Sequence, residues 1–519
     1  MTTTDPSALR AVCVPLPATP GKASVDPVAV AADGGHLFVG PARTVAGHGT
    51  AAVLSLPRGL DDPAGLAAVR AWLAAVPVVQ VPAVGGSPSP VPPRPVVAVG
   101  ALPFDRGAPG TLTVPARAFC RSADGAEWLV GVGTASGRGA RAAGGGSHRA
   151  GGDEAASEAA ALLAWLAAAA GTTSSGAGGR PGDGTPAVDD VTFLPPGEGY
   201  AHAVADAVAA IRAGHLRKVV LARAVDVEFA AGSGRAPVLP APGEVLRRLW
   251  AGDPSFTAFS VPVPEGRFVG ASPELIVARA GREVSSLPLA GTVSLPAAGG
   301  AASDAAVARL LGSAKDLDEH RLVVEAVAAG LARRCDDVTV PDDPIVVRLR
   351  SDARLGTPVR ALAPPARHGA VLGAEPAPGT EVDGCSALDL LAELHPTPAV
   401  GGVPRPQALA RIGTLEAVPR GYWAGPVGWV DGSGDGEWVL AIRSVTLVDG
   451  RARVLAGAGI VAASDPRREL EETTVKLSPV LDALVPSASA LLGRDHRPGA
   501  GVVRRQTPTG PTGPGGPAA

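Results

Sequence analysis

Lysine is rare in this chain, so the few lysines are the first candidates for acid–base chemistry. Among 46 basic residues, the lysines are Lys22, Lys218, Lys315 and Lys476. Desolvation can remove the proton of an ammonium group, whereas a guanidinium stays charged. Lys218 opens the apolar segment KVVLARAVDV, which would desolvate the side chain. Lys218 is therefore a candidate general base, and an exposed lysine at a strand edge is the alternative.

A glutamate between two apolar segments is the matching candidate for a general acid. Glu274 lies in FVGASPELIVAR, after a Gly/Pro turn and before an apolar stretch. Burial favours the neutral form of a carboxyl group, so such a glutamate can still carry its proton near neutral pH. A solvent-exposed turn glutamate is the alternative.

Carboxylates in two predicted helices suggest a site for a hard metal ion. Glu319 lies in KDLDEHRLVV, and RRELEETTVK places Glu469 and Glu472 three residues apart on one helical face, with Lys476 four residues further on. Oxygen ligands without soft donors suit Mg²⁺ better than zinc. The alternative is two solvated helix faces with ordinary ion pairs.

Three further segments offer groups that bind anions or polar substrates. Exposed backbone N–H groups in AGAGIV, at Gly457, Ala458 and Gly459, could bind a carboxylate, or the segment could be a plain tight turn. Arg443 in VLAIRSV is flanked by apolar residues, as expected of an anion ligand or a buried ion-pair member. His395 in ELHPTPAVGG could orient a substrate, although a structural role fits the sequence equally well.

Alternating apolar patterns and helical spacing predict the elements that position these residues. Strands joined by hairpins, with helices interspersed, favour a mixed α+β fold over a doubly wound parallel sheet. The predicted helices are 64–75, one beginning near 153, 199–213, 242–250, 302–334 and 466–484. The predicted strands of the second half are 218–227, 256–261, 267–270, 275–279, 425–429, 437–448 and 451–457.

Composition divides the chain into four parts. Residues 1–135 are predicted to be a β-rich N-terminal part of the same fold, and 136–190 a Gly/Ala-rich, partly disordered insertion. Residues 191–487 form the catalytic region, and the Pro/Gly-rich segment 488–519 is predicted to be a disordered tail.

Bulk properties argue against several classes of protein. A net charge of −3 and 3% aromatic residues give no basic patch or stacking surface for nucleic acid. No apolar run is long enough for a membrane span, and no secretion signal precedes the first strand, so we expect a cytoplasmic protein. The four cysteines are scattered without CxxC spacing, which predicts neither disulfides nor a zinc site.

Read in order, the motifs resemble those of the chorismate-utilising enzymes, and among them the isochorismate synthases. The resemblance covers roughly residues 195–485 and is carried by these segments: RKVVLAR, FVGASPEL, PLAGT, KDLDEHRLVV, HPTPAVGG, PRGYWAGPVGW, AIRS, AGAGIV and EETTVKLSP. It implies two large packed antiparallel sheets with outer helices, a site between them, chorismate as the substrate, and a monomer.

The resemblance also implies a role for each candidate residue. Lys218 would activate water for attack at C2 of the ring, and Glu274 would protonate the departing C4 hydroxyl. Glu319 and Glu472 would hold Mg²⁺, with Glu469 acting through water, and the ion would bind the ring carboxylate. The residues implied to contact substrate are Thr292, His395, Arg443, Gly457, Ala458, Gly459 and Lys476.

Two positions help to choose within the family. Ammonia-using anthranilate synthases usually carry glutamine where this chain has Lys218, so Lys218 points to water as the nucleophile. Ala290 stands where some aminodeoxychorismate synthases place a covalent lysine. A salicylate synthase, which also eliminates pyruvate, and a non-catalytic chorismate-binding relative remain the alternatives. The motifs fit both menaquinone and siderophore biosynthesis.

Overall fold

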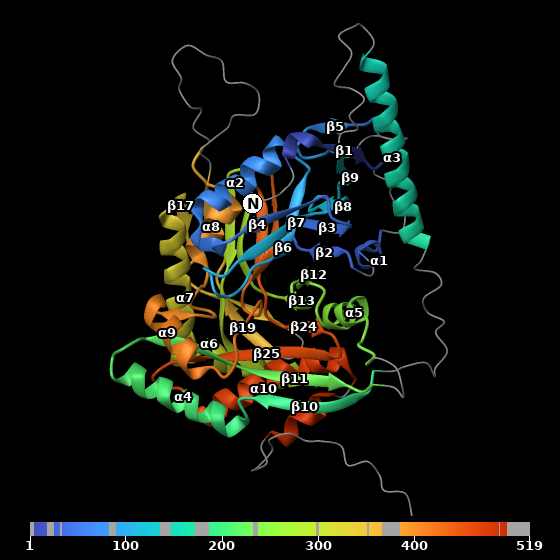
Figure 1. Ribbon diagram of the computed structural model, residues 1–519. Helices are drawn as coiled ribbons and strands as arrows, with labels where there is room; N and C mark the ends of the chain where they lie inside the picture. Colours follow the sequence, from blue (N-terminus) through green and yellow to red (C-terminus); the bar gives the residue numbers. More distant parts are fainter. Residues whose placement is uncertain are drawn as a thin grey trace, which may run out of the picture.

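The computed structural model in Figure 1 shows extended sheets with helices around them. No helix among the described residues is both long enough and apolar enough to cross a membrane. The described residues are 5–17, 25–31, 34–82, 90–134, 147–171, 186–231, 237–296, 300–349, 352–365, 385–486 and 488–495.

The larger sheet draws strands from both ends of the sequence. Over the described residues it has 13 strands, which pair antiparallel except for β1 with β5. Its order is β10 (Val188–Leu194), β11 (Lys218–Phe229), β25 (Arg451–Ile460), β24 (Ser444–Val448), β13 (Gly266–Ser272), β12 (Thr257–Val263), β2 (His36–Val39), β3 (Arg43–His48), β8 (Arg117–Ser122), β9 (Glu127–Thr134), β1 (Leu9–Pro15) and β5 (Val78–Gln80), with β21 (Gly402–Val403) beside β11.

Two further antiparallel sheets complete the strand framework of the described residues. The nine-stranded sheet runs β17 (Asp336–Thr339), β20 (Val359–Leu362), β15 (Glu283–Leu287), β14 (Leu275–Ala280), β23 (Gly436–Leu440), β22 (Pro426–Asp431), β6 (Val97–Ala101), β7 (Gly110–Val114) and β4 (Ala52–Leu56). A three-stranded sheet runs β16 (Leu289–Ser294), β19 (Asp352–Gly356) and β18 (Ile345–Arg348).

The hydrophobic core joins the two large sheets. Phe38 and Phe259 of the larger sheet and Trp438 of the nine-stranded sheet are fully buried in one apolar cluster. Burying an aromatic side chain of this size stabilises a fold by roughly 2–3 kcal/mol. Because strands from both halves of the chain share each sheet, the β-rich N-terminal part and the later part form one core. The predicted α+β fold of two large packed antiparallel sheets is confirmed.

Helices lie on the outside of the sheets (Figure 1). Helix α10 packs on β25, α4 packs on α10 and β11, and α7 packs on β16. The helices are α1 (Pro27–Val30), α2 (Pro63–Ala75), α3 (Ser147–Gly171), α4 (Gly197–Arg212), α5 (Pro242–Gly252), α6 (Gly300–Leu311), α7 (Ala314–Ala332), α8 (Ala387–Leu394), α9 (Arg405–Leu415) and α10 (Pro466–Leu484).

The prediction of one helix over 302–334 is wrong. The segment forms α6 and α7, which are separated at Gly312 and Ser313. The Ser313 side chain accepts a hydrogen bond from the backbone N–H of Asp316, and this N-cap starts a new helix. Glu319 therefore lies in the second turn of α7 rather than in the middle of a long helix.

The prediction of one strand over 437–448 is also wrong. The chain leaves the nine-stranded sheet after β23 and enters the larger sheet at β24. Arg443 lies at the crossover with φ 50°, a left-handed conformation that is unusual for a residue other than glycine. Such strain persists only where the surroundings enforce it, and it is common at functional sites.

The predicted insertion and tail are described in part. Of the tail, Ala488–Arg494 forms a 3-10 helix with Leu492 buried, and Asp495 pairs with the buried Arg223. Helix α3 begins at Ser147, six residues before the predicted start near 153. The flanking segments 135–146 and 172–185, the tail from 496 to 519 and Lys22 are not among the residues that the structure describes.

Candidate active site

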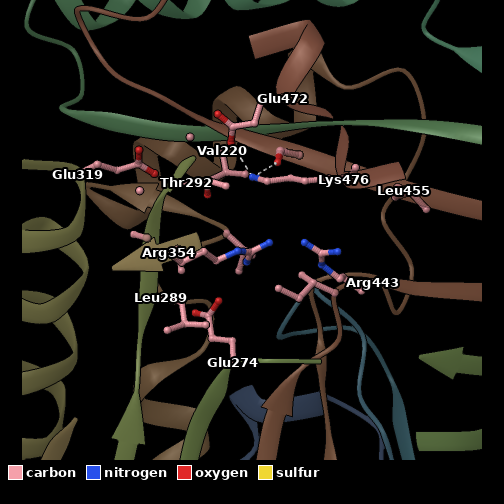
Figure 2. A pocket seen from close by; sticks show the side chains of 18 of the residues that line it. Val220, Glu274, Leu289, Thr292, Glu319, Arg354, Arg443, Leu455, Glu472 and Lys476 are labelled. Atoms are coloured by element: carbon pink, nitrogen blue, oxygen red, sulfur yellow. Dashed lines mark hydrogen bonds and ion pairs between the residues drawn. The ribbon is translucent and has the colours of Figure 1, made fainter. Parts of the chain in front are cut away.

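A cavity lies where β11, β16, β19 and β25 approach one another, and most of the predicted site residues surround it. Its empty volume is about 690 Å³, part of it open to solvent. Figure 2 shows Glu319 and Glu472 on one side of the cavity, Glu274 on the opposite side, and Arg354 and Arg443 between them. The lining residues are Val220, Glu274, Leu289, Ala290, Gly291, Thr292, Glu319, Arg354, Ala399, Val400, Trp423, Ile442, Arg443, Leu455, Ala456, Gly457, Gly459, Glu472 and Lys476.

Lys218 lies just behind the cavity wall. It is the first residue of β11, its side chain is fully buried, and its Nζ is 3.0 Å from Oε1 of Glu319. Glu319 itself lines the cavity. The predicted burial of Lys218 is therefore observed, and the ammonium group is held beside a carboxylate rather than at an exposed strand edge.

Glycine at position 459 makes room for this ion pair. Gly459 lies opposite Val220 in the β25–β11 ladder and lines the cavity. A methyl group added there would overlap Oε1 of Glu319 and would lie 3.2 Å from Cε of Lys218. Gly457 likewise leaves space for Trp423, whose ring would lie 3.0 Å from an added methyl group.

We predict that Gly459→Ala lowers turnover by about 100-fold, the loss that a displacement of about 1 Å can cause. The added methyl group must push the Glu319 carboxylate and the Lys218 side chain away from their present positions. Gly133→Ala is the matched control, because Gly133 also lies in a strand and an added methyl group meets nothing within 4 Å. Steady-state rates of the two variants test the prediction, with melting temperatures measured to confirm that both are folded. Equal rates would contradict it.

Glu274 forms the opposite side of the cavity as a buried carboxyl group. Its residue is 4% exposed, and burial raises its pKa to about 7, against the opposing attraction of Arg354, then of Lys218. The backbone N–H of Leu289 also opposes this rise in pKa. A carboxyl group with this pKa is well suited to donate a proton near neutral pH.

Three carboxylates gather near the start of α7 and α10, each paired with a lysine. Besides the Lys218–Glu319 pair, Lys315 Nζ lies 2.9 Å from Oε1 of Glu469, and Lys476 Nζ lies 2.7 Å from Oε1 of Glu472. Lys476 also donates to the Gly457 carbonyl at 3.0 Å. Burial and the charge of Glu472 both raise the pKa of Glu469. Burial alone would lower the pKa of Lys315, but the attraction of Glu469, Glu472 and Glu319 raises it above its usual value.

These carboxylates match magnesium in chemistry. They supply hard oxygen donors, and Oε2 of Glu469 is buried without a hydrogen-bond partner among the described residues. Over the same residues, no three acidic, histidine or cysteine side chains are grouped closely enough to hold a metal ion. Each of the three carboxylates is paired with a lysine instead.

Two arginines and an aspartate occupy the middle of the site. Arg443 Nη2 donates to Oδ2 of the fully buried Asp352 at 2.6 Å, and Arg354 Nη2 donates to the same atom at 3.3 Å. Burial would raise the pKa of Asp352, but Arg354 and Arg443 together hold it below its usual value. Arg443 also borders a second cavity, between α5 and α10, with an empty volume of about 1310 Å³.

Thr292 reaches the cavity because β16 is irregular. Its register with β19 shifts between Ala290 and Thr292, and Gly291 between them has φ 72°. After the shift, Thr292 pairs with Arg354, and both line the cavity. The Gly-Thr pair of the PLAGT segment therefore sets the position of the hydroxyl group.

The structure does not bring His395 or the Ala458 side chain to the cavity. His395 is fully buried, its Nε2 lies 2.9 Å from the Phe104 carbonyl oxygen, and burial lowers its pKa to about 3. Ala458 faces the apolar core on the alternate side of β25 from Gly457 and Gly459. Residues 457–460 form the last part of β25, so the alternative of a plain tight turn is wrong.

Arg354 and Asp352 were not predicted as site residues. They lie in RLRSDARLGT, where several arginines close together resemble ordinary surface charge. The signal that could have found Arg354 is the one used for Arg443, an arginine between apolar neighbours in a short strand.

Known proteins match this chain over the segment that contains the site residues. Residues 148–482 match the family model of the chorismate binding enzymes. The putative isochorismate synthase MenF of Mycobacterium tuberculosis is 41% identical over 312 residues, which cover 58% of this chain and 76% of the relative. Isochorismate synthase DhbC of Bacillus subtilis is 36% identical over 300 residues, covering 56% and 69%.

A solved structure extends the likeness beyond the matched segment. The putative 2,3-dihydroxybenzoate-specific isochorismate synthase DhbC of Bacillus anthracis superimposes with a TM-score of 0.63 at 28% identity, covering 87% of this chain and 96% of that one. The superposition covers more of the chain than residues 148–482, so the likeness includes structure outside the segment that the family model matches.

Proposed function

This chain belongs to the chorismate binding enzyme family, and we propose that it is an isochorismate synthase that converts chorismate into isochorismate. The observation that carries the proposal is the placement of Glu274 across the cavity from Glu319 (Figure 2). Lys218 pairs with Glu319 at 3.0 Å on that far side. An isomerisation that adds a hydroxyl group at one ring carbon and removes one at another needs a base and an acid on opposite sides of the ring.

Lys218 is the proposed base. Its side chain is buried and lies beside Gly459 at the cavity wall, so a water molecule at that wall would be within reach of it. The lysine would act as the neutral amine, which takes the proton from water and becomes the ammonium. Activated water would attack C2, and the ring double bond would shift as the C4 hydroxyl leaves.

Glu274 is the proposed acid. It carries its proton up to about pH 7 because it is buried, and it can pass this proton to the departing C4 hydroxyl. The proton gained by Lys218 and the proton lost by Glu274 balance, so the reaction consumes and releases water without net change.

Glu319, Glu469 and Glu472 are the proposed ligands of Mg²⁺, which would neutralise the ring carboxylate when bound. The buried, unpartnered Oε2 of Glu469 and the oxygen-only donor set support this choice. Thr292, Lys476 and the backbone at Gly457 and Gly459 would contact the substrate from the same side.

Two adjacent glutamates test the proposed magnesium site, because only one of them is a proposed ligand. Glu472→Gln should weaken divalent-ion binding by at least about 10- to 100-fold, the loss reported for outer partners of metal ligands. Glu471→Gln should leave it unchanged, because Glu471 is exposed. Mn²⁺ titration followed by electron paramagnetic resonance measures binding without turnover. Equal affinity in both variants would contradict the assignment, as would full activity in excess chelator.

Product identity tests the function itself. Purified protein is incubated with chorismate and Mg²⁺, and the products are separated by chromatography and identified by mass. Isochorismate is the expected product. Salicylate with pyruvate would replace the proposal by a salicylate synthase, and no turnover would replace it by a non-catalytic chorismate-binding protein. Similar proteins include a menaquinone-specific isochorismate synthase and a vibriobactin-specific one, so isochorismate from this chain would serve menaquinone or siderophore biosynthesis.

A further inference from the structure

We propose that Arg354 is a second substrate-binding arginine, which forms with Arg443 a two-arginine clasp for one carboxylate of the substrate. The inference rests on the proposed function and adds a residue to it. Arg354 lies in β19, lines the cavity and is 6% exposed. Figure 2 shows its guanidinium and that of Arg443 directed toward the same central space from opposite sides.

Asp352 holds the two guanidinium groups in place from behind. Its Oδ2 accepts from Arg443 at 2.6 Å and from Arg354 at 3.3 Å, and Asp352 itself does not line the cavity. Because both arginines contact one oxygen atom, their planar groups lie close together at the cavity wall. Two guanidinium groups in this arrangement can pair with the two oxygen atoms of a single carboxylate.

Unused donors point to an acceptor that comes from outside the chain. The Nε atoms of both Arg354 and Arg443 are buried without a hydrogen-bond partner among the described residues. A buried donor left in this state is costly, and a folded protein normally satisfies it. A carboxylate bound between the guanidinium groups would supply acceptors for both.

The balance of charge favours an anion at this place. Arg354 and Arg443 bring two positive charges, and the fully buried Asp352 compensates one of them. Glu274, which lines this half of the cavity, is kept largely neutral below pH 7 by burial. Asp253 also attracts Arg443, but it borders the second cavity and not this one. This half of the cavity therefore keeps a net positive charge, whereas Glu319 and Glu472 occupy the other half with their lysines.

Chorismate carries two carboxylates, which fits these two halves. The proposed metal site would take the ring carboxylate, so the enolpyruvyl carboxylate is the group left for the clasp. A purely structural Arg354 would be needed only to neutralise Asp352, but Arg443 already does so at the shorter distance.

Two competitive inhibitors that differ by one carboxylate test the clasp. The probes are meta-(carboxymethoxy)benzoate, which has the second carboxylate, and meta-methoxybenzoate, which lacks it. In Arg354→Met, affinity for the dicarboxylate should fall by about 10- to 100-fold, as expected for charged hydrogen bonds, while affinity for the monocarboxylate stays within about twofold. Arg354→Lys keeps the charge without the fork and should lose less.

Arg360→Met is the control for a general effect of removing an arginine, because Arg360 is exposed on β20, the next strand along the chain. Equal losses for both probes in Arg354→Met and Arg354→Lys would show a distorted pocket and overturn the clasp, and so would unchanged affinity for the dicarboxylate. Calorimetric binding of the probes does not require turnover. A wild-type protein that binds them with this discrimination but does not isomerise chorismate would therefore overturn the proposed function alone.

Discussion

Lys218→Met is expected to lower kcat by about 10²- to 10⁴-fold, the usual contribution of a general base. Methionine fills nearly the same buried space but cannot take a proton from water. The side chain of Lys218 is fully buried, so a smaller residue would leave a cavity and confuse loss of chemistry with loss of packing. Steady-state kinetics with chorismate measure the effect.

Arg217→Met provides the matched control, because Arg217 directly precedes Lys218 and is exposed. Its kcat should remain within about twofold of the wild-type value, as expected for surface substitutions. If Lys218→Met retained a near wild-type rate in a folded protein, Lys218 would not be the base.

Glu274→Gln is the second variant with a large expected effect, again about 10²- to 10⁴-fold in kcat. The glutamine cannot donate the proton that the C4 hydroxyl needs to leave. In the wild-type enzyme, kcat/KM should fall as the pH rises above about 7, because Glu274 then loses its proton. The residual activity of Glu274→Gln should lack this alkaline limb. Glu283→Gln, at an exposed position of β15, should keep both the wild-type rate and the fall in kcat/KM at alkaline pH.

The same substitution should stabilise the fold at alkaline pH. The pKa of Glu274 is about 7 in the folded chain against an ordinary value of 4.5, so folding favours its protonated form. The stability due to this group is present below pH 4.5 and is lost as the pH rises through 7. The free energy of unfolding of Glu274→Gln should therefore exceed that of the wild type by roughly 3 kcal/mol at pH 8 and by less than about 1 kcal/mol at pH 5. A difference in melting temperature that does not grow from pH 5 to pH 8 would contradict this account.

Local patterns in the sequence were enough to predict many elements, but not the points where the chain changes partner. Helix α10 was predicted with its observed bounds, because Asp465 and Pro466 form a clear start and the apolar spacing continues to Leu484. The break at Ser313 and the crossover at Arg443 were missed. Both lie inside segments of continuous helical or strand pattern, and the geometry there depends on tertiary contacts.

The site was predicted best where a charged residue interrupts an apolar segment. Lys218, Glu274 and Arg443 were found in this way, and all are buried around one cavity. Arg354 escaped because its arginine-rich surroundings mask the same signal. The Glu472–Lys476 pair follows from their spacing of four residues on one helix. The pairing of Glu319 with Lys218 could not be predicted, since the two are about 100 residues apart and meet only through packing of α7 against the sheets.

Turnover of chorismate in water enriched in heavy oxygen shows whether water is the nucleophile, because the product mass reports both the reaction and the source of the new hydroxyl group. We expect isochorismate that carries one solvent-derived oxygen at C2, formed by the wild type and lost in Lys218→Met. Isochorismate without the heavy oxygen would mean that the hydroxyl group moves within the substrate, and it would contradict the roles assigned to Lys218 and Glu274.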